Sequence, residues 1–249
     1  MGCFSSSFFS LRFGYRVAVS FNKEYIEKWL LDQLDIEPQQ DCIATSPLLV
    51  IESTMKCLRL FISLRPDSQV LKAWNDFQIR APAWPVRWTP LDQLHITLKF
   101  LGETPPEREP KIILALREAV ANRAPFSLQL KGGGLFPPKG SPSTIWAGVE
   151  GNIDALVSLA VSVEKACEPL EFPLEKRTYH PHLTVGRAPS EIKPGKNLRW
   201  LRSAYQEWIA NFESPAFSVK DIVLMQSHLS PRGSQYEVRS VWPMSDGLT

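Results

Sequence analysis

The chain has 249 residues, of which 44% are hydrophobic and 22% are charged, and its formal net charge is +2. This composition excludes wholesale disorder, and the length allows one large domain or two small ones with a proper core. The sequence has no run of 18 apolar residues, which excludes a membrane-spanning helix. Its four cysteines are scattered singly, without the spacing of a zinc site or a disulfide framework, so we expect a reducing, cytoplasmic compartment.

Residues 1–54 differ in charge from the rest of the chain. They hold 4 Lys/Arg and 7 Asp/Glu, which leaves 28 − 4 = 24 and 26 − 7 = 19 for the remainder, so the two parts carry −3 and +5. Three interpretations stay open: a Met-Gly-x-x-x-Ser acylation signal, an acid-poor targeting peptide, or a stretch appended upstream of a domain that begins at Met55. We therefore expect an N-terminal extension over 1–54, poorly ordered or appended, and a functional domain over 55–249.

From Met55 onward, strand-like and helix-like segments alternate between proline and glycine breaks. Strands are expected at 58–64, 86–88, 95–101, 126–131, 144–149, 182–186, 217–227 and 235–242. Helices are expected at 68–80, 106–122, 153–167 and 198–211. The glycines that follow Lys131 are expected to form a turn. Alternation of this kind indicates a mixed α/β domain, with the direction of the strands left open.

Two segments repeat one short pattern: Leu94-His95-Ile96-Thr97-Leu98 and Pro181-His182-Leu183-Thr184-Val185. Because side chains alternate along a strand, each His and Thr share one face while the apolar residues pack on the other. A single His-x-Thr match carries a high false-positive risk. Here, however, two of only four histidines occupy matching positions, 182 − 95 = 87 residues apart. We therefore expect two imidazoles and two hydroxyls to meet across one cleft.

This set of side chains suits the cleavage of a cyclic phosphate. In-line displacement needs a base for the attacking water and an acid for the leaving oxygen. Histidines with pKa values near about 6.5 can divide these tasks, because small differences in environment leave one neutral and the other charged. The threonine hydroxyls can donate hydrogen bonds to the non-bridging oxygens. The chemistry requires no metal and no cofactor.

The similarity of this chain to known sequences extends well beyond the two motifs. It covers residues 57–243 and includes Arg59-Leu60-Phe61-Ile62, Val86-Arg87-Trp88-Thr89, Gly134-Leu135-Phe136-Pro137, Ile145-Trp146-Ala147-Gly148-Val149, and Tyr236-Glu237-Val238. On these residues the sequence resembles the 2H phosphoesterase superfamily, and within it the RNA 2′,3′-cyclic phosphodiesterases, also called 2′-5′ RNA ligases.

The resemblance implies an α+β fold that is bilobal and pseudo-two-fold, with two antiparallel-rich sheets flanking a central cleft and helices outside. It also implies an enzyme that hydrolyses RNA 2′,3′-cyclic phosphate ends to 2′-phosphate, with 2′-5′ ligation as a lesser capacity. The expected partners are RNA ends, tRNA fragments among them, and the expected state is a monomer.

By the same resemblance, His95 would be the acid that protonates O3′ and His182 the base that activates water, although the order of the two roles stays open. Thr97 and Thr184 would hold the phosphate oxygens. Arg187, which closes the second motif, would add a charge-assisted contact.

Three further side chains have a functional and a structural interpretation. Arg187 has the opposite parity to His182, so a bulge or strand end must turn it back toward the cleft. Lys99 has the parity of His95 and is a candidate substrate contact, or else a solvated strand residue. Phe136 is a candidate for stacking on a base, or else a core aromatic residue.

Two other functions remain open. The same histidines could open a small cyclic nucleotide or the cyclic phosphate of ADP-ribose. Alternatively, the domain could bind RNA ends without catalysis, although binding alone does not require a matched acid and base.

Overall fold

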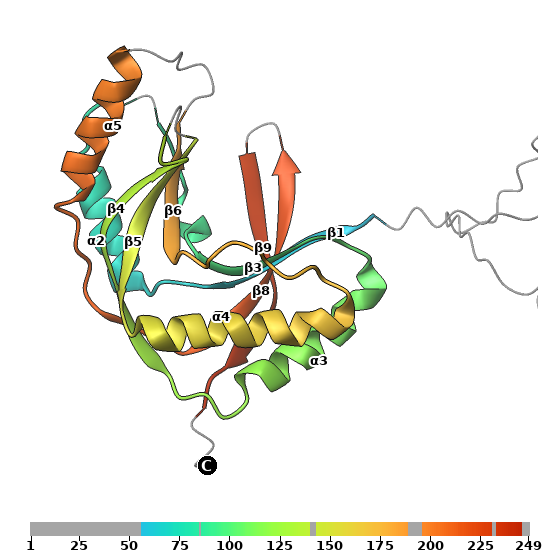
Figure 1. Ribbon diagram of the computed structural model, residues 1–249. Coiled ribbons are helices and arrows are strands. Elements are labelled where there is room, and N and C mark those ends of the chain that lie inside the picture. Colours follow the sequence, from blue (N-terminus) through green and yellow to red (C-terminus); the bar gives the residue numbers. More distant parts are fainter. Residues whose placement is uncertain (1–55, 85, 140–142, 189–195, 231–232, 246–249) are drawn as a thin grey trace, which may run out of the picture. The chain divides into compact units, whose positions relative to one another are not determined.

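The computed structural model describes residues 56–84, 86–139, 143–188, 196–230 and 233–245 (Figure 1). All the elements of the fold belong to the unit Cys57–Thr249. The expectation for residues 1–54 lies outside the described residues and stays a prediction.

Every expected strand and helix is present in the described residues. The strands are β1 (Leu58–Leu64), β2 (Arg87–Trp88), β3 (Ile96–Thr104), β4 (Phe126–Phe136), β5 (Thr144–Gly151), β6 (His182–Arg187), β7 (Phe217–Val219), β8 (Asp221–Ser230) and β9 (Gly233–Pro243). The helices are α2 (Ser68–Gln78), α3 (Glu109–Val120), α4 (Ile153–Cys167) and α5 (Lys196–Ile209), with 3-10 turns η1 (Leu91–Gln93), η2 (Pro106–Arg108) and η3 (Glu168–Leu170). The strand expected over 217–227 is divided at Lys220 into β7 and β8.

The strands form one antiparallel sheet in the order β7-β4-β5-β6-β3-β1-β8-β9, and β2 pairs with β6 at the side. Its two halves meet where β3 pairs with β6, and Ile96 and Leu183 are the partners at that contact. The α+β class and the pseudo-two-fold order are therefore confirmed. The two expected sheets are the two halves of this continuous sheet.

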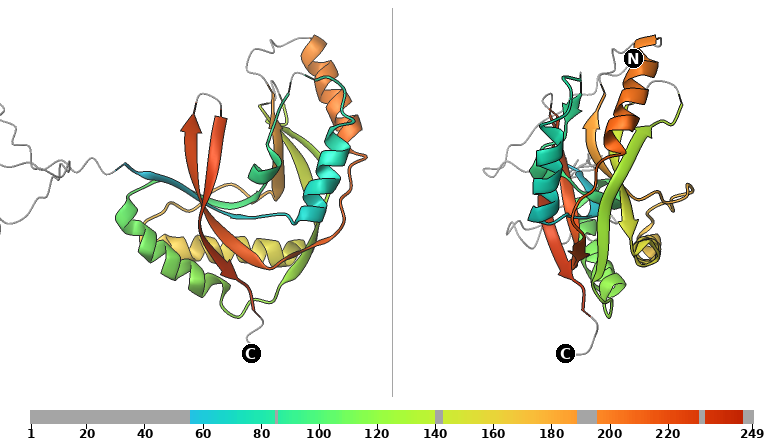
Figure 2. Two further views of the ribbon diagram at one scale, coloured as in Figure 1. Left: turned by 180° about the vertical axis from the view of Figure 1, so that it is seen from behind. Right: turned by 90° about the vertical axis from the view of Figure 1, so that its left-hand side faces the viewer.

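Helices cover one face of the sheet in two pairs. In Figures 1 and 2, α3 and α4 lie side by side along the half that contains β3 and β9, while α2 and α5 lie beside the β4–β5 half. Local sequence explains where two helices begin: the Asp67 carboxylate accepts two backbone N–H bonds ahead of α2, and the Asn152 amide oxygen accepts one ahead of α4. Aromatic side chains join α2 to α5, with the rings of Trp74 and Trp208 6.1 Å apart.

Strand β4 is longer than the sequence predicts, because the glycines after Lys131 continue the strand instead of forming a turn. A Cβ atom on Gly133 would lie 2.2 Å from the carbonyl oxygen of Trp146, so only glycine allows β4 to pass this close to β5. The extension carries Phe136 to the part of the sheet where the second His-x-Thr motif lies.

Candidate active site

The pairing that joins the two halves of the sheet also brings the two motifs together. Ile96 and Leu183 are opposite each other and both are fully buried. Their neighbours in the motifs therefore point to the other face of the sheet, which we call the site face. Because the strands are antiparallel, this register sets His95 alongside Thr184 and His182 alongside Thr97. All four side chains are partly accessible, as a site for a soluble ligand requires.

The two histidine rings are held in the same way. Nδ1 of His95 lies 2.7 Å from the carbonyl oxygen of Gln93, and Nδ1 of His182 lies 2.8 Å from the carbonyl oxygen of His180. A carbonyl oxygen only accepts, so Nδ1 carries the proton and donates in both rings. In each neutral ring Nε2 is therefore the unprotonated nitrogen, and either ring can use it to take up a proton or, once charged, to give one.

The pKa values of both histidines are lowered from the usual value of the side chain. Burial lowers the pKa of His95, the hydrogen bond to Gln93 raises it, and the nearby His182 lowers it further. Burial also lowers the pKa of His182, against an upward effect of the His180 carbonyl. The pKa values of both rings thus lie below 6.5, and an anionic phosphate bound between them would favour their charged forms.

Aromatic rings from distant strands pack against His95. The ring of Phe61 on β1 lies 4.8 Å from it, and the ring of Tyr236 on β9 meets it edge-on at 5.0 Å. Phe61 and Tyr236 also contact each other at 5.0 Å. The sequence motifs assign no role to these two residues, because nothing in the sequence places β1 and β9 beside the first histidine.

His182 has a matching aromatic support in the other half. Phe136 meets its ring edge-on at 5.1 Å and stacks on Trp146 at 5.2 Å. Trp146 and His180 are in edge contact at 5.1 Å. Phe136 is half-buried and backs the second histidine; its contact with a substrate base stays a prediction.

A bulge turns Arg187 toward the site face, as its expected role requires. Thr184 pairs with Trp146 and Gly186 pairs with Ile145, so Val185 is an extra residue in β6. The bulge reverses the parity of the strand. Arg187 consequently faces Thr144, and its Nη1 donates to the Thr144 hydroxyl at 3.2 Å.

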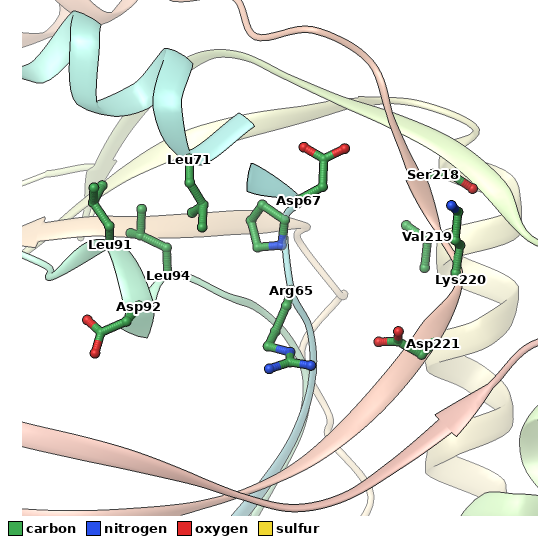
Figure 3. Close-up of a pocket in the computed structure, with 11 residues that line it drawn as sticks. Arg65, Asp67, Leu71, Leu91, Asp92, Leu94, Ser218, Val219, Lys220 and Asp221 are labelled. Atoms are coloured by element: carbon green, nitrogen blue, oxygen red, sulfur yellow. The ribbon is translucent and has the colours of Figure 1, made fainter. Parts of the chain in front are cut away.

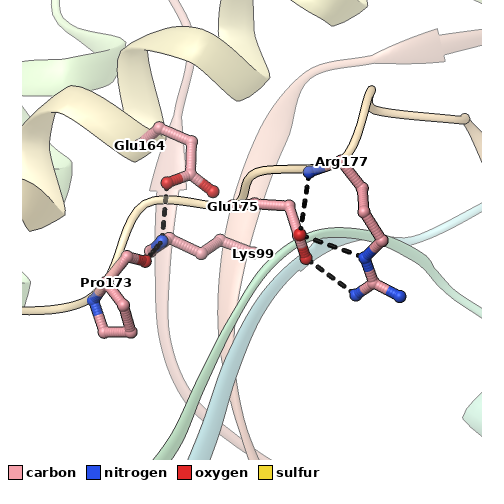
Figure 4. Close-up of polar contacts among 5 residues, drawn as sticks. All are labelled: Lys99, Glu164, Pro173, Glu175 and Arg177. Carbon is pink, nitrogen blue, oxygen red and sulfur yellow. Dashed lines mark hydrogen bonds and ion pairs between the residues drawn. The ribbon is translucent and has the colours of Figure 1, made fainter.

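Lys99 is not available as a substrate contact, and that expectation is wrong. Thr97 pairs with Ser63 whereas Lys99 pairs with Ile62, so Leu98 is an extra residue that reverses the parity of β3. The Lys99 side chain, 3% exposed, turns under α4 and donates to Glu164 at 2.6 Å and to the carbonyl oxygen of Pro173 at 2.9 Å. Figure 4 shows Lys99 directed at these two partners.

The same bulge places Phe100 where the second motif has Arg187, each five residues after its histidine. Phe100 pairs with Phe61, which lies on the site face against His95, and 70% of Phe100 is exposed. The two strands therefore carry different side chains at matching positions: a phenyl ring in β3 and a guanidinium in β6.

The fold and the paired His-x-Thr strands define a two-histidine phosphoesterase. The family model of the 2′-5′ RNA ligase superfamily matches residues 66–230. The chain belongs to this superfamily, whose members share the 2H phosphoesterase fold. No helix in the described part of the chain is long and apolar enough to cross a membrane.

Individual relatives agree with this assignment. The chain is 33% identical over 203 residues to an RNA 2′,3′-cyclic phosphodiesterase of Geobacillus stearothermophilus, a match that covers 78% of this chain and 61% of the relative. It is 31% identical over 185 residues to a protein of the same name from Methanocaldococcus jannaschii, covering 74% of this chain and all of the relative. Among solved structures, TT0787 of Thermus thermophilus superposes with a TM-score of 0.60 at 26% identity, covering 77% of this chain and all of the other. Escherichia coli LigT, at 22% identity and a TM-score of 0.58, shares the fold.

Proposed function

We propose that this protein hydrolyses RNA 2′,3′-cyclic phosphate ends to 2′-phosphates without a metal. The observation that carries the proposal is the pair of Nδ1-anchored histidines, which leave two Nε2 atoms on one face beside two threonine hydroxyls. Two relatives that the chain matches at 31–33% identity bear the name of this activity. We further propose that the protein acts as a monomer in the cytoplasm, with tRNA fragments among its substrates.

The reaction divides between the two histidines. Nε2 of neutral His182 takes a proton from water as the water oxygen bonds to phosphorus. The bond from phosphorus to O3′ breaks, and Nε2–H of charged His95 protonates O3′ as it leaves. Thr97, Thr184 and Arg187 donate to the phosphate oxygens, whose charge grows in the transition state. If the 5′-hydroxyl of a second RNA replaces the water, the same steps form a 2′-5′ linkage.

The product identifies the reaction. Incubation of the protein with an RNA oligonucleotide ending in 2′,3′-cyclic phosphate, in the presence of EDTA, is expected to yield only the 2′-phosphate. The terminal phosphate can be identified by chromatography against authentic 2′- and 3′-phosphate standards. Loss of turnover in EDTA would contradict metal-free chemistry. An unchanged RNA end would favour a small cyclic nucleotide as the substrate, or binding without catalysis.

The rate of hydrolysis is expected to peak on the acidic side of neutrality. Catalysis requires one neutral and one charged imidazole, so kcat/KM falls below the lower and above the higher of the two pKa values of the free enzyme. Burial lowers both pKa values below 6.5, and the maximum should therefore lie below pH 6.5. Steady-state rates measured between pH 4 and 9 on a short cyclic-phosphate RNA test this; a maximum above pH 7 would contradict it.

A further inference from the structure

A second feature of the site is a pocket of about 290 Å³ that opens beside His95. Two of its lining residues touch that ring, because Gln93 accepts its Nδ1–H bond and Tyr236 packs against it. The other walls come from β2 with the residues that follow it, from the end of β6, from the last residue of β8 and from the first residues of β9. A substrate whose phosphate lies between the two histidines can therefore extend directly into this pocket.

The described residues that line the pocket carry only positive charge. They include Arg87 and Arg187, and none of them is an aspartate or a glutamate. The two arginines are direct neighbours across the β2–β6 pairing, an arrangement in which like charges repel. Neither forms an ion pair with a carboxylate within the described residues. A bound anion would relieve that repulsion.

The guanidinium groups of Arg87 and Arg187 lie at different places in the site, so the two residues can bind different groups of a substrate. The end of the Arg87 side chain lies at the start of β9, since Nη1 would be 3.5 Å from a Cβ atom on Gly233. Arg187 instead donates to Thr144 in the strand next to the second motif. The pocket thus offers a second guanidinium beyond the one placed at the reacting phosphate. Hydroxyl and amide side chains of Thr89, Ser234 and Gln235 line the space around it.

A second pocket, of about 470 Å³, differs from the pocket beside His95 in the charge of its lining (Figure 3). There the cations Arg65 and Lys220 are interspersed with three acidic residues, Asp67, Asp92 and Asp221. Its described lining carries two positive and three negative side chains, and it contains neither the histidine nor the threonine of either motif. Arg65 therefore provides a matched control for Arg87, as an exposed arginine lining a different pocket.

We propose that Arg87 binds the phosphate on the 5′ side of the terminal nucleoside, so that the protein selects RNA ends over cyclic mononucleotides. The next anionic group of an RNA end, after the cyclic phosphate, is this 5′ phosphate, and guanidinium is the side chain best suited to hold it. A cyclic mononucleotide with a free 5′-hydroxyl lacks the group. The proposal rests on the proposed function and specifies its substrate class.

Two substrates that differ only in this group test the proposal: adenosine 2′,3′-cyclic phosphate with a 5′-hydroxyl, and the same compound with a 5′-phosphate. The wild-type protein should prefer the 5′-phosphate form by roughly tenfold in kcat/KM, the effect of one exposed charge-assisted contact. Arg87→Gln should reduce the ratio of the two kcat/KM values to near one, whereas Arg65→Gln should preserve it. Added NaCl should lower the wild-type ratio, because the contact is exposed to solvent.

Binding of the products gives a readout independent of turnover. Calorimetry should show that Arg87→Gln lowers the affinity for adenosine 2′,5′-bisphosphate about tenfold more than the affinity for adenosine 2′-phosphate. A wild-type protein without preference in either assay would overturn the proposal. So would equal losses on both substrates in Arg87→Gln, which would place Arg87 at the reacting phosphate. Failure to hydrolyse the cyclic-phosphate RNA as well as both mononucleotides, with the binding difference retained, would contradict the proposed function and leave the Arg87 subsite supported.

Discussion

Replacement of His182 or His95 by alanine is expected to lower kcat by a factor of about 10² to 10⁴, the usual contribution of a positioned acid or base. Each ring supplies a proton or accepts one through Nε2, and alanine leaves no group in that place. Both rings lie at the site face with part of their surface accessible, so their loss should leave the fold intact. Steady-state kinetics on a short cyclic-phosphate RNA and circular dichroism of each variant measure the two effects.

His228→Ala is the matched control, because His228 is exposed on β8, contacts Glu237 and belongs to neither His-x-Thr motif. A substrate with sulfur in place of O3′ separates the acid from the base, since a thiolate leaves without a proton. His95→Ala should recover much of its rate on that substrate and His182→Ala should not. Recovery in the His182 variant alone would reverse the two roles, and full activity of both variants on the natural substrate would contradict the site.

Lys99→Met is expected to destabilise the protein by about 3 kcal/mol, because it leaves the partly buried carboxylate of Glu164 without its ion-pair partner. Methionine matches the length of lysine, so the loss reflects charge more than volume. The variant also loses the bond from Nζ to the Pro173 carbonyl. The free energy of unfolding can be followed in urea by tryptophan fluorescence.

A double-mutant cycle identifies the cause of the Lys99 effect. Adding Glu164→Leu to Lys99→Met should recover part of the lost stability, since an apolar pair often replaces a buried ion pair at little cost. Lys72→Met breaks an exposed pair with Asp76 and should change the unfolding free energy by less than about 0.5 kcal/mol. A Lys99→Met protein as stable as the Lys72 variant would show that the buried pair contributes nothing.

The sequence was sufficient to predict the order of the elements and the two motifs, because alternation in strands and proline or glycine breaks are local properties. It was also sufficient to predict that His95 and Thr97 share a face. The sequence was not sufficient to predict which face the residues after each threonine occupy, because a bulge at Leu98 and another at Val185 reverse the alternation of the strand. Bulges of this kind depend on the partner strand, and alternation alone predicted the wrong side for Lys99.

The surroundings of the histidines depend on contacts between distant parts of the chain. Phe61 and Tyr236 meet His95 because β3, β1, β8 and β9 are neighbours in the sheet, which no local pattern reveals. Arg87 lay within a segment that resembled the family, yet its place in the pocket follows from the pairing of β2 with β6.

The matched bulges in β3 and β6 have a consequence for how a ligand is oriented. A perfectly symmetric pair of motifs would accept an RNA end in two opposite directions, and each histidine would then meet the water half of the time. The bulges present Phe100 at one end and Arg187 at the corresponding other end. An anionic backbone is drawn to the arginine and gains nothing from the phenyl ring, so we expect one direction of binding to dominate. Phe100 and Arg187, each five residues after its histidine, therefore set the direction in which the RNA end binds. That direction decides which of the two similar imidazoles acts as the acid and which as the base.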